Sequence, residues 1–442
     1  MKTKRPVQSK CKLITNIISN RALNRIAVKS GFKKRAYKKI SPLSIIGSYL
    51  NFISNGKFSF SAWAVELSSM ISCTVSKQGI YKRMTPLLVN YLKMVLESIV
   101  SGQILSKSLL KTRHFSDFKN VYLHDATSFS LPLHLVHRFP GHFSSGAKAV
   151  AKIQTVFNLT KRCFSFFELT GYTCADIKST PVVNQKLKAG DLIIRDLGYF
   201  AIHCFEQVMQ ADAFFLSRFK HNVAVREIQN AAPVNLMKIL RKNNTIDVQV
   251  WLSSLMPLPV RLVAVELPSS IANARRRKAR KDNRSPKLNH SKAYYFLLGY
   301  AIYITNVPVA IWSVQQISEA YKCRWYIETI FKSWKSNLNA RYTDCERYAN
   351  ELTVETHFYL LMIYVCIIIM PLLTLIEKHC HKRKLKVQIS LLKLTSFIAS
   401  SLHQLMNNLI YKPLIERIIY YVKYDKRSDY KNFNDHFLLI LS

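Results

Sequence analysis

Apolar residues recur at three-and-four spacing over residues 42–103, most regularly in SAWAVELSSMISCTVSKQGIYKRMTPLLVNYLKMVLESIV. This spacing gives a helix one apolar face, so the region is predicted to be helical. Ser76 has the character of a helix cap, and the helix that follows carries Lys77, Lys82 and Arg83. The pattern suits a helix-turn-helix that reads DNA, and it suits a helical packing domain equally well.

After residue 115 the pattern changes to short apolar runs separated by turn residues. NVYLHDATSFSLP and GDLIIRDLGYF each contain an apolar run that ends in an acid, Asp125 or Asp196. KAVAKIQTVFNLT and CFSFFELTGYT are typical of two further strands. A helix over residues 200–210 and a strand over 212–219 follow. Strands separated by helices predict an α/β core with parallel strands, in which each aspartate closes a strand.

Residues 220–312 break that pattern. Alternation in TIDVQVWLSS, PVRLVAVEL and YYFLLGYAIYITNV predicts an antiparallel β insertion. Within it, NARRRKARKDNRSPKLNHSK (273–292) holds nine basic residues, one acid and no apolar pattern, which predicts a mobile loop that grips phosphates. Arg275, Arg276 and Arg277 are its candidate DNA contacts. From residue 313 the pattern is helical again.

Composition adds a partner to this picture. The 442 residues include 65 Lys plus Arg against 25 Asp plus Glu, a net charge of +40, which indicates a polyanion such as nucleic acid. Residues 1–40 carry basic side chains and no acid, typical of a solvated arm or of one that docks on phosphates. Nine cysteines without a CxxC motif indicate reduced thiols in a cytoplasmic protein rather than a zinc site.

One uncharged stretch, FYLLMIYVCIIIMPLLTLI (358–376), has about the length of a membrane span. Its flanks are weak and Pro371 interrupts it. We therefore expect a buried core helix and no membrane association, with a span as the alternative.

YKCRWYIETIFKSWKS (321–336) places a single acid among basic and aromatic residues. On one continuous helix, Tyr321, Arg324, Glu328 and Lys335 fall within an arc of roughly 60°. One interpretation is a surface stripe whose Arg–Glu pair contributes only a few tenths of a kcal/mol. Lys332 lies on the same predicted helix.

The two aspartates favour a functional interpretation of the lone glutamate. The carboxyl ends of parallel strands gather at one edge of a sheet, where Asp125, Asp196 and Glu328 would form a set of three. Three carboxylates repel one another unless a cation neutralises them, and oxygen ligands suit Mg²⁺ or Mn²⁺. Two such ions activate a water or a 3′-hydroxyl against a phosphodiester.

These motifs resemble those of DDE transposases of bacterial insertion sequences. YKCRWYIETIFKSWK matches the family's Y-(2)-R-(3)-E-(6)-K signature, while HDATSFSLP and GDLIIRDLGYF are similar to its two Asp motifs. The subgroup is the family named after insertion sequence four. Two departures stand out: Ala126 follows the first Asp where Gly is frequent, and Leu197 replaces the Arg of Asp-Arg-Gly-Tyr. The alternative is therefore a catalytically decayed transposase that only binds DNA.

The resemblance implies an α/β ribonuclease-H-like core in which Asp125, Asp196 and Glu328 bind two Mg²⁺ or Mn²⁺ ions. It implies hydrolysis at the element's inverted repeats and joining of the 3′-OH ends to target DNA (cut-and-paste), with a homodimer in the synaptic complex. Tyr321 and its signature partners would contact phosphates, in a cytoplasmic, nucleoid-associated protein. If a hairpin intermediate forms, Trp251 and Trp312 are candidates to stack on a flipped base, although each suits the core better.

The resulting division of the chain has six parts. They are a basic arm (1–40), a helical DNA-binding region (41–115), the first part of the core (116–219), a mostly β insertion domain (220–312), the second part of the core (313–380) and a helical C-terminal region (381–442).

Overall fold

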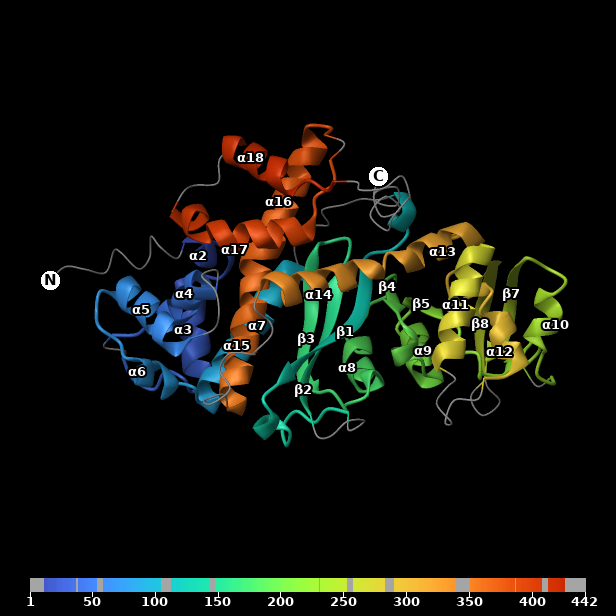
Figure 1. Cartoon of the computed structure of the whole chain (residues 1–442), viewed down its shortest axis with the longest axis horizontal. Helices are drawn as coiled ribbons and strands as arrows, with labels where there is room; N and C mark the ends of the chain where they lie inside the picture. Colours follow the sequence, from blue (N-terminus) through green and yellow to red (C-terminus); the bar gives the residue numbers. More distant parts are fainter. Residues whose placement is uncertain are drawn as a thin grey trace.

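The computed structural model describes residues 12–36, 39–53, 59–104, 113–142, 148–229, 231–252, 257–282, 290–338, 350–385, 387–407 and 412–425. In these ranges one sheet of nine strands runs through the molecule in the order β3-β2-β1-β4-β5-β9-β8-β7-β6 (Figure 1). The strands are β1 (Val121–Leu131), β2 (Ala149–Asn158), β3 (Cys163–Gly171), β4 (Leu192–Arg195), β5 (Phe214–Arg218), β6 (Val225–Arg226), β7 (Thr245–Leu252), β8 (Leu258–Glu266) and β9 (Tyr300–Thr305).

The first five strands form a mixed sheet. β1 and β2 pair antiparallel, as do β2 and β3, whereas β4 pairs parallel with both β1 and β5. The strands predicted in this part of the chain are confirmed. A mixed α/β architecture with a large sheet fits the ribonuclease-H-like fold that the motifs imply.

The helices lie on both faces and at both ends of this sheet (Figure 1). Their bounds are α2 (Lys12–Ile17), α3 (Asn20–Lys29), α4 (Pro42–Ile53), α5 (Phe60–Ile71), α6 (Lys77–Tyr81), α7 (Pro86–Ile104), α8 (Thr180–Asn184), α9 (Ile202–Gln210), α10 (Leu236–Leu240), α11 (Ser269–Asp282), α12 (Lys292–Leu297), α13 (Val314–Lys322), α14 (Trp325–Asn337), α15 (Glu351–Tyr364), α16 (Met370–Lys382), α17 (Leu391–Asn407) and α18 (Lys412–Val422).

Alternation along the strands divides the core into two clusters. Leu123 and Ile194 pack on one face with residues of α7, α14 and α15. Tyr122 and Ile193, one position earlier on the same strands, pack on the other face with residues of α9. Because successive side chains point to opposite faces, residues 125 and 196 share the face that α14 covers.

Residues 220–312 extend this sheet. β7 pairs antiparallel with β6 and β8, and β9 joins β8 to β5, also antiparallel. Arg261 on β8 ties this part together: its guanidinium donates to both carboxylate oxygens of Asp247 at 2.7 Å and to the carbonyls of Val307 and Trp312. That these residues form a separate insertion domain stays a prediction, as do the other domain boundaries.

The mobile loop predicted over residues 273–292 is wrong for its first ten residues, which belong to helix α11. Ala, Arg and Lys are strong helix formers. The packed side of this helix is carried by Ala272 and Ala279, two small residues seven positions apart, both buried. Two alanines are too few and too small to produce the hydrophobic periodicity from which a helix is predicted. Residues 283–289 lie outside the described residues.

The long apolar stretch forms one helical run, Glu351–Lys382, long and apolar enough to cross a membrane, but 78% of its most apolar window is buried inside the structure. Burial is what we expect of a core helix. Pro371 does not end the run. Instead the five residues before Met370, Val365–Ile369, adopt π-helical hydrogen bonding, which accommodates a proline that has no N–H. Gln103 donates to the carbonyl of Cys366 within this segment at 2.7 Å.

Candidate active site

Asp125 and Asp196 lie side by side where two parallel strands separate. The parallel pairing of β1 with β4 ends at His124 and Arg195, and the two aspartates occupy the next position on each chain. β4 ends before Asp196, as expected. The prediction that Asp125 also closes its strand is wrong, because β1 continues to Leu131 as the antiparallel partner of β2.

Glu328 lies in the first turn of α14, near enough to Asp125 for its charge to raise the pKa of that carboxyl. Arg324, immediately before this helix, links it to the strand: Nη1 lies 2.7 Å from Asp125 Oδ2 and Nη2 lies 2.6 Å from Glu328 Oε1. The hydroxyl of Tyr321, in the last turn of α13, donates to Asp196 Oδ1 at 3.0 Å. The structure therefore places all three carboxylates within electrostatic reach of Arg324, with Asp125 and Glu328 bridged by its guanidinium and Asp196 bonded to Tyr321.

The single helix predicted over residues 321–336 is wrong in one detail. α13 ends at Lys322 and α14 begins at Trp325. Between them, the amides of Arg324 and Ile327 donate to carbonyls three residues back, so the chain makes a tighter turn than an α-helix. Because of this turn, Tyr321 contacts Asp196 after β4, while Glu328 lies on the side of Asp125 on β1.

The electrostatics of the site are dominated by burial. Burial raises the pKa of Asp125 to about 6, an effect that Arg324 opposes and that the neighbouring carboxylates of Glu328 and Asp196 reinforce. Burial, followed by the charge of Asp196, also raises the pKa of Tyr321 above its usual range, which keeps this hydroxyl a proton donor. Burial alone would lower the pKa of Arg324, but Tyr321 and the carboxylates raise it, so the guanidinium stays charged.

These residues fit a divalent cation by the chemistry of their donors. Three carboxylates supply six oxygens, the ligand type that Mg²⁺ and Mn²⁺ prefer. Burial raises the pKa of Asp125 by more than Arg324 lowers it, so an additional cation would favour the ionised carboxylate. In the described part of the chain, no three His, Cys, Asp or Glu side chains approach closely enough to hold an ion in the present arrangement. Arg324 instead forms ion pairs with both Asp125 and Glu328.

A polar network, which sequence reasoning missed, lies beneath the aspartates on the other face of the sheet. Arg195 is fully buried and donates from Nε to His124 Nδ1 at 3.1 Å and from Nη2 to Asn184 Oδ1 at 2.7 Å. Burial lowers the pKa of Arg195 to about 10 and, with the charge of Arg195 added, lowers that of His124, so the imidazole is neutral and can accept. The only available signal was a charged residue inside an apolar strand.

A second part of this network supports the loop after Asp196. Tyr199 donates to Gln154 Oε1 at 2.7 Å, and Gln154 Nε2 in turn donates to Asp176 Oδ1 at 2.8 Å, which Lys152 also reaches. A Cβ at Gly198 would lie 3.0 Å from Asp176 Oδ2, so glycine lets the loop approach this carboxylate closely.

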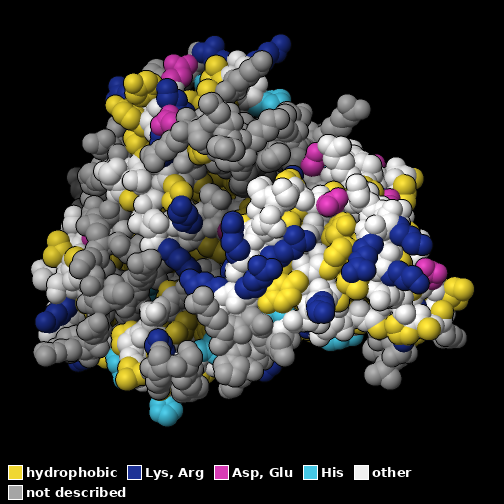
Figure 2. Space-filling view, turned by 45° about the vertical axis from the view of Figure 1, so that its right-hand side comes forward, with side chains coloured by type: hydrophobic (Ala, Val, Ile, Leu, Met, Phe, Trp, Pro, Cys, Tyr) yellow, Lys and Arg dark blue, Asp and Glu magenta, His cyan; other side chains and the backbone are white. Residues whose placement is uncertain are grey.

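The remaining predicted DNA contacts are spread over two helices. Lys332 is exposed and Lys335 half-buried on α14. On α11, Arg275 and Arg276 donate to the carbonyls of Tyr300 and Tyr295, so these two side chains are partly used in packing. Arg277 on the same helix is exposed. Figure 2 shows Lys and Arg side chains in a row across this side of the molecule, with few acidic ones.

The tryptophans agree with the expectation that Trp312 belongs to the core, and they add a further candidate for stacking. Trp312 is fully buried and donates to the carbonyl of His114 at 3.0 Å, so it belongs to the core. Trp251 is half-buried on β7. The exposed one is Trp325, which is 52% exposed beside Arg324, with the guanidinium carbon 5.5 Å from its ring centre. Its position inside the aromatic motif was the signal that could have found it.

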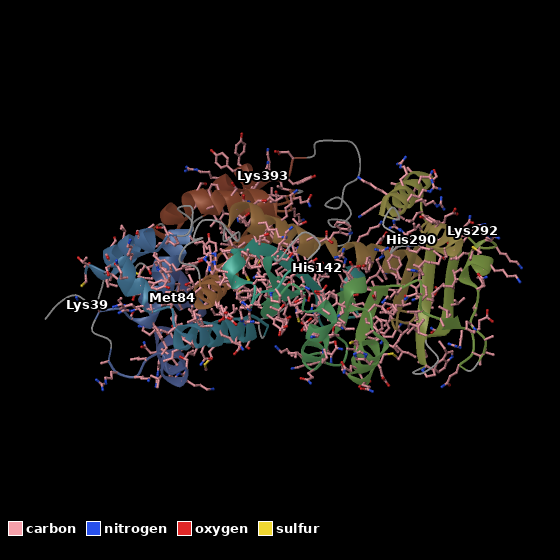
Figure 3. All side chains as sticks on the ribbon, turned by 60° about the horizontal axis from the view of Figure 1, so that its bottom comes forward. Lys39, Met84, His142, His290, Lys292 and Lys393 are labelled. Atoms are coloured by element: carbon pink, nitrogen blue, oxygen red, sulfur yellow. The ribbon has the colours of Figure 1, made fainter. Side chains whose placement is uncertain are left out.

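A basic pocket lies in the N-terminal helical region. Its cavity of about 490 Å³ is lined by five cationic side chains from two distant segments. They are Lys33, Lys34, Arg35, Lys82 and Arg83. In Figure 3, Lys39 and Met84 mark this end of the molecule, whereas His290 and Lys292 mark the end that carries α11.

The class of protein follows from a family match, which supports a nucleic-acid-processing enzyme. The family model described as the Transposase DDE domain matches residues 116–365, more than half of the chain, and the chain belongs to this family.

Individual transposases are similar to the chain over most of its length. It is 28% identical over 322 residues to the transposase for insertion sequence element IS231F of Bacillus thuringiensis subsp. israelensis, covering 68% of this chain and 67% of that protein. It is 27% identical to the IS231B transposase of subsp. berliner (78% and 76% covered), and 24% identical to that of IS1151 of Clostridium perfringens (62% of each).

Proposed function

We propose that the chain is an active transposase that binds the terminal inverted repeats of its insertion sequence, cleaves them and joins the 3′-OH ends to target DNA. The observation that carries this proposal is the convergence of Asp125, Asp196 and Glu328, cross-linked through Arg324 and met by Tyr321. A chain that had lost catalysis would have no need to keep three mutually repelling carboxylates together.

Asp125, Asp196 and Glu328 would hold two Mg²⁺ or Mn²⁺ ions. When bound, such ions supply Lewis-acid activation of the attacking water or 3′-hydroxyl and stabilise the leaving oxygen. With such ions bound, the carboxylates would no longer depend on Arg324 for positive charge. The guanidinium could then bind a phosphate oxygen, since its charge-assisted hydrogen bonds suit a phosphate as well as a carboxylate. We assign phosphate contacts to Arg324 and Lys335, and a stacking platform to Trp325, whose exposed ring is large enough to receive an unpaired base.

DNA would contact the molecule well beyond the active site. The basic pocket lies at the N-terminal end of the molecule and α11 lies toward the opposite end, with β1, β4 and α14 between them (Figures 1 and 3). A duplex that follows both would pass the catalytic edge. We expect a homodimer in the synaptic complex, and a protein that works on nucleoid DNA in the cytoplasm without a membrane.

The test is a cleavage assay on a labelled duplex that carries the inverted repeat flanking the protein's own gene, with Mg²⁺, Mn²⁺ or Ca²⁺. We expect nicking at the repeat boundary with the first two ions and none with Ca²⁺. Glu328→Gln should abolish nicking while leaving repeat binding intact. Glu319→Gln, the same change on the preceding helix, is the control. A gel shift without any cut by the unaltered protein would mean a binding-only protein.

A further inference from the structure

Arg324 occupies the position between two carboxylates that a divalent cation would need. We infer that Arg324 is an exchangeable internal cation: it neutralises Asp125 and Glu328 until a divalent cation binds, and it then turns to a DNA phosphate. This inference rests on the proposed function and deepens it, because it makes cation loading and phosphate binding two ends of one exchange. Its basis is the bridge of 2.7 Å to Asp125 and 2.6 Å to Glu328.

The contacts of Asp125 show which partner a cation would compete with. Asp125 Oδ1 accepts from the amide of Ala126 at 2.8 Å, and Oδ2 accepts from Arg324 at 2.7 Å. A lone pair remains on each oxygen, but a cation beside Oδ2 and Glu328 Oε1 would meet the positive guanidinium that already bridges them. The amide of Ala126 belongs to the strand and is fixed. The side chain of Arg324 is the partner that can move.

The surroundings of Arg324 favour a second position. Its Nε is buried and, among the described residues, has no hydrogen-bond partner, so the present position leaves one of its donors unsatisfied. The guanidinium lies within 5.9 Å of the ring centres of Tyr321 and exposed Trp325. The side chain starts from the turn between two helices and ends beside an aromatic surface. A phosphate at that surface would accept the hydrogen bonds that Arg324 no longer donates to the carboxylates.

Reciprocity follows from this exchange. If phosphate binding holds Arg324 away from the carboxylates, it must tighten cation binding, and cation binding must tighten phosphate binding by the same factor. Binding of DNA would then raise the affinity of the carboxylates for the catalytic ions. A protein without DNA would keep its carboxylates neutralised internally.

Direct titration of the full-length protein with Mn²⁺, without DNA, tests the exchange by isothermal calorimetry. We expect Arg324→Met to bind Mn²⁺ about tenfold more tightly than the unaltered protein, because no charge-assisted bridge has to be broken. Lys322→Gln removes the same charge two residues away, where it makes no ion pair in the described residues, and should change affinity by no more than about twofold. Equal or weaker binding by Arg324→Met would show that the arginine positions the carboxylates and would overturn the inference.

A second measurement needs no change at Arg324 and so does not depend on how that variant folds. Addition of a pre-cleaved repeat-end duplex should tighten Mn²⁺ binding to the unaltered protein roughly five- to tenfold, after subtraction of binding to the duplex alone. Unchanged affinity would refute the exchange while leaving the proposed function standing. If the Glu328→Gln variant binds Mn²⁺ as tightly as the unaltered protein does, the carboxylate site itself is wrong and both proposals fall.

Discussion

Asp125 should make the cation-free protein less stable as the pH rises. Burial raises the pKa of this carboxyl from its ordinary 3.8 to about 6. The folded chain therefore binds the Asp125 proton more tightly than the unfolded chain does. The stability that this proton contributes is fully present below about pH 3.8, declines as the pH rises, and is lost above about pH 6. Asp125→Asn removes this dependence.

The magnitude follows from the interval between the two pKa values, 3.8 and about 6. At about 1.36 kcal/mol for each pH unit, ionising Asp125 in the folded protein costs about 3 kcal/mol. The side chain is only 18% exposed, so solvent screening reduces this figure little. The net gain from Asp125→Asn will be smaller than 3 kcal/mol, because asparagine gives up the charged contact with Arg324.

Urea denaturation in EDTA, followed by tryptophan fluorescence, measures the effect as a difference between variant and unaltered protein at about pH 4 and about pH 8. We expect the difference to shift in favour of Asp125→Asn at the higher pH. Glu319→Gln controls for removal of a nearby acid. A difference that does not change with pH, or that favours the unaltered protein at the higher pH, would refute the reasoning. Mn²⁺ should then stabilise the unaltered protein and leave Asp125→Asn almost unaffected.

Three further outcomes are expected. Arg261→Met should lower the free energy of unfolding by about 3 kcal/mol or more, because it leaves Asp247 and two carbonyls unpaired; the double variant with Asp247→Leu should recover part of the loss in urea denaturation. Lys335→Ala should weaken binding to cleaved ends and flatten its salt dependence, whereas unchanged affinity in fluorescence anisotropy would reduce it to a surface lysine. Replacing Lys82 and Arg83 by Gln should lower the slope of log affinity against log salt by about 1.8, and an unaltered slope would remove the basic pocket from the DNA path.

The sequence predicted the composition of the site better than its geometry. Residue types and spacing were enough to single out Asp125, Asp196 and Glu328, because carboxylates beside strand ends are costly without a purpose. The structure brings them together, and their catalytic role stays a prediction. Periodicity could not show that β1 runs on past Asp125, since the strand loses β4 as a partner there but keeps β2, and its pattern of side chains does not change.

Three other features leave no trace in the hydrophobic pattern of the sequence. The tight turn at Arg324 is helical in its backbone angles, so only its hydrogen bonds separate α13 from α14. The helix α11 packs through alanines, which carry little hydrophobic signal. The burial of Arg195 is explained only by the structure, in which the neutral ring of His124 and the side-chain oxygen of Asn184 accept its hydrogen bonds.

The place where pairing between β1 and β4 ends affects how far the amino-acid sequence around the site can change. Asp125 and Asp196 follow directly after paired residues, so their separation is inherited from the spacing of neighbouring strands, about 4.8 Å. The main chain sets that distance, and no particular set of core side chains is required to maintain it. Most of the surrounding residues can therefore be exchanged while the two carboxylates remain aligned. Such tolerance is in keeping with the 24% to 28% identity of this chain to the IS1151 and IS231F transposases over the aligned residues.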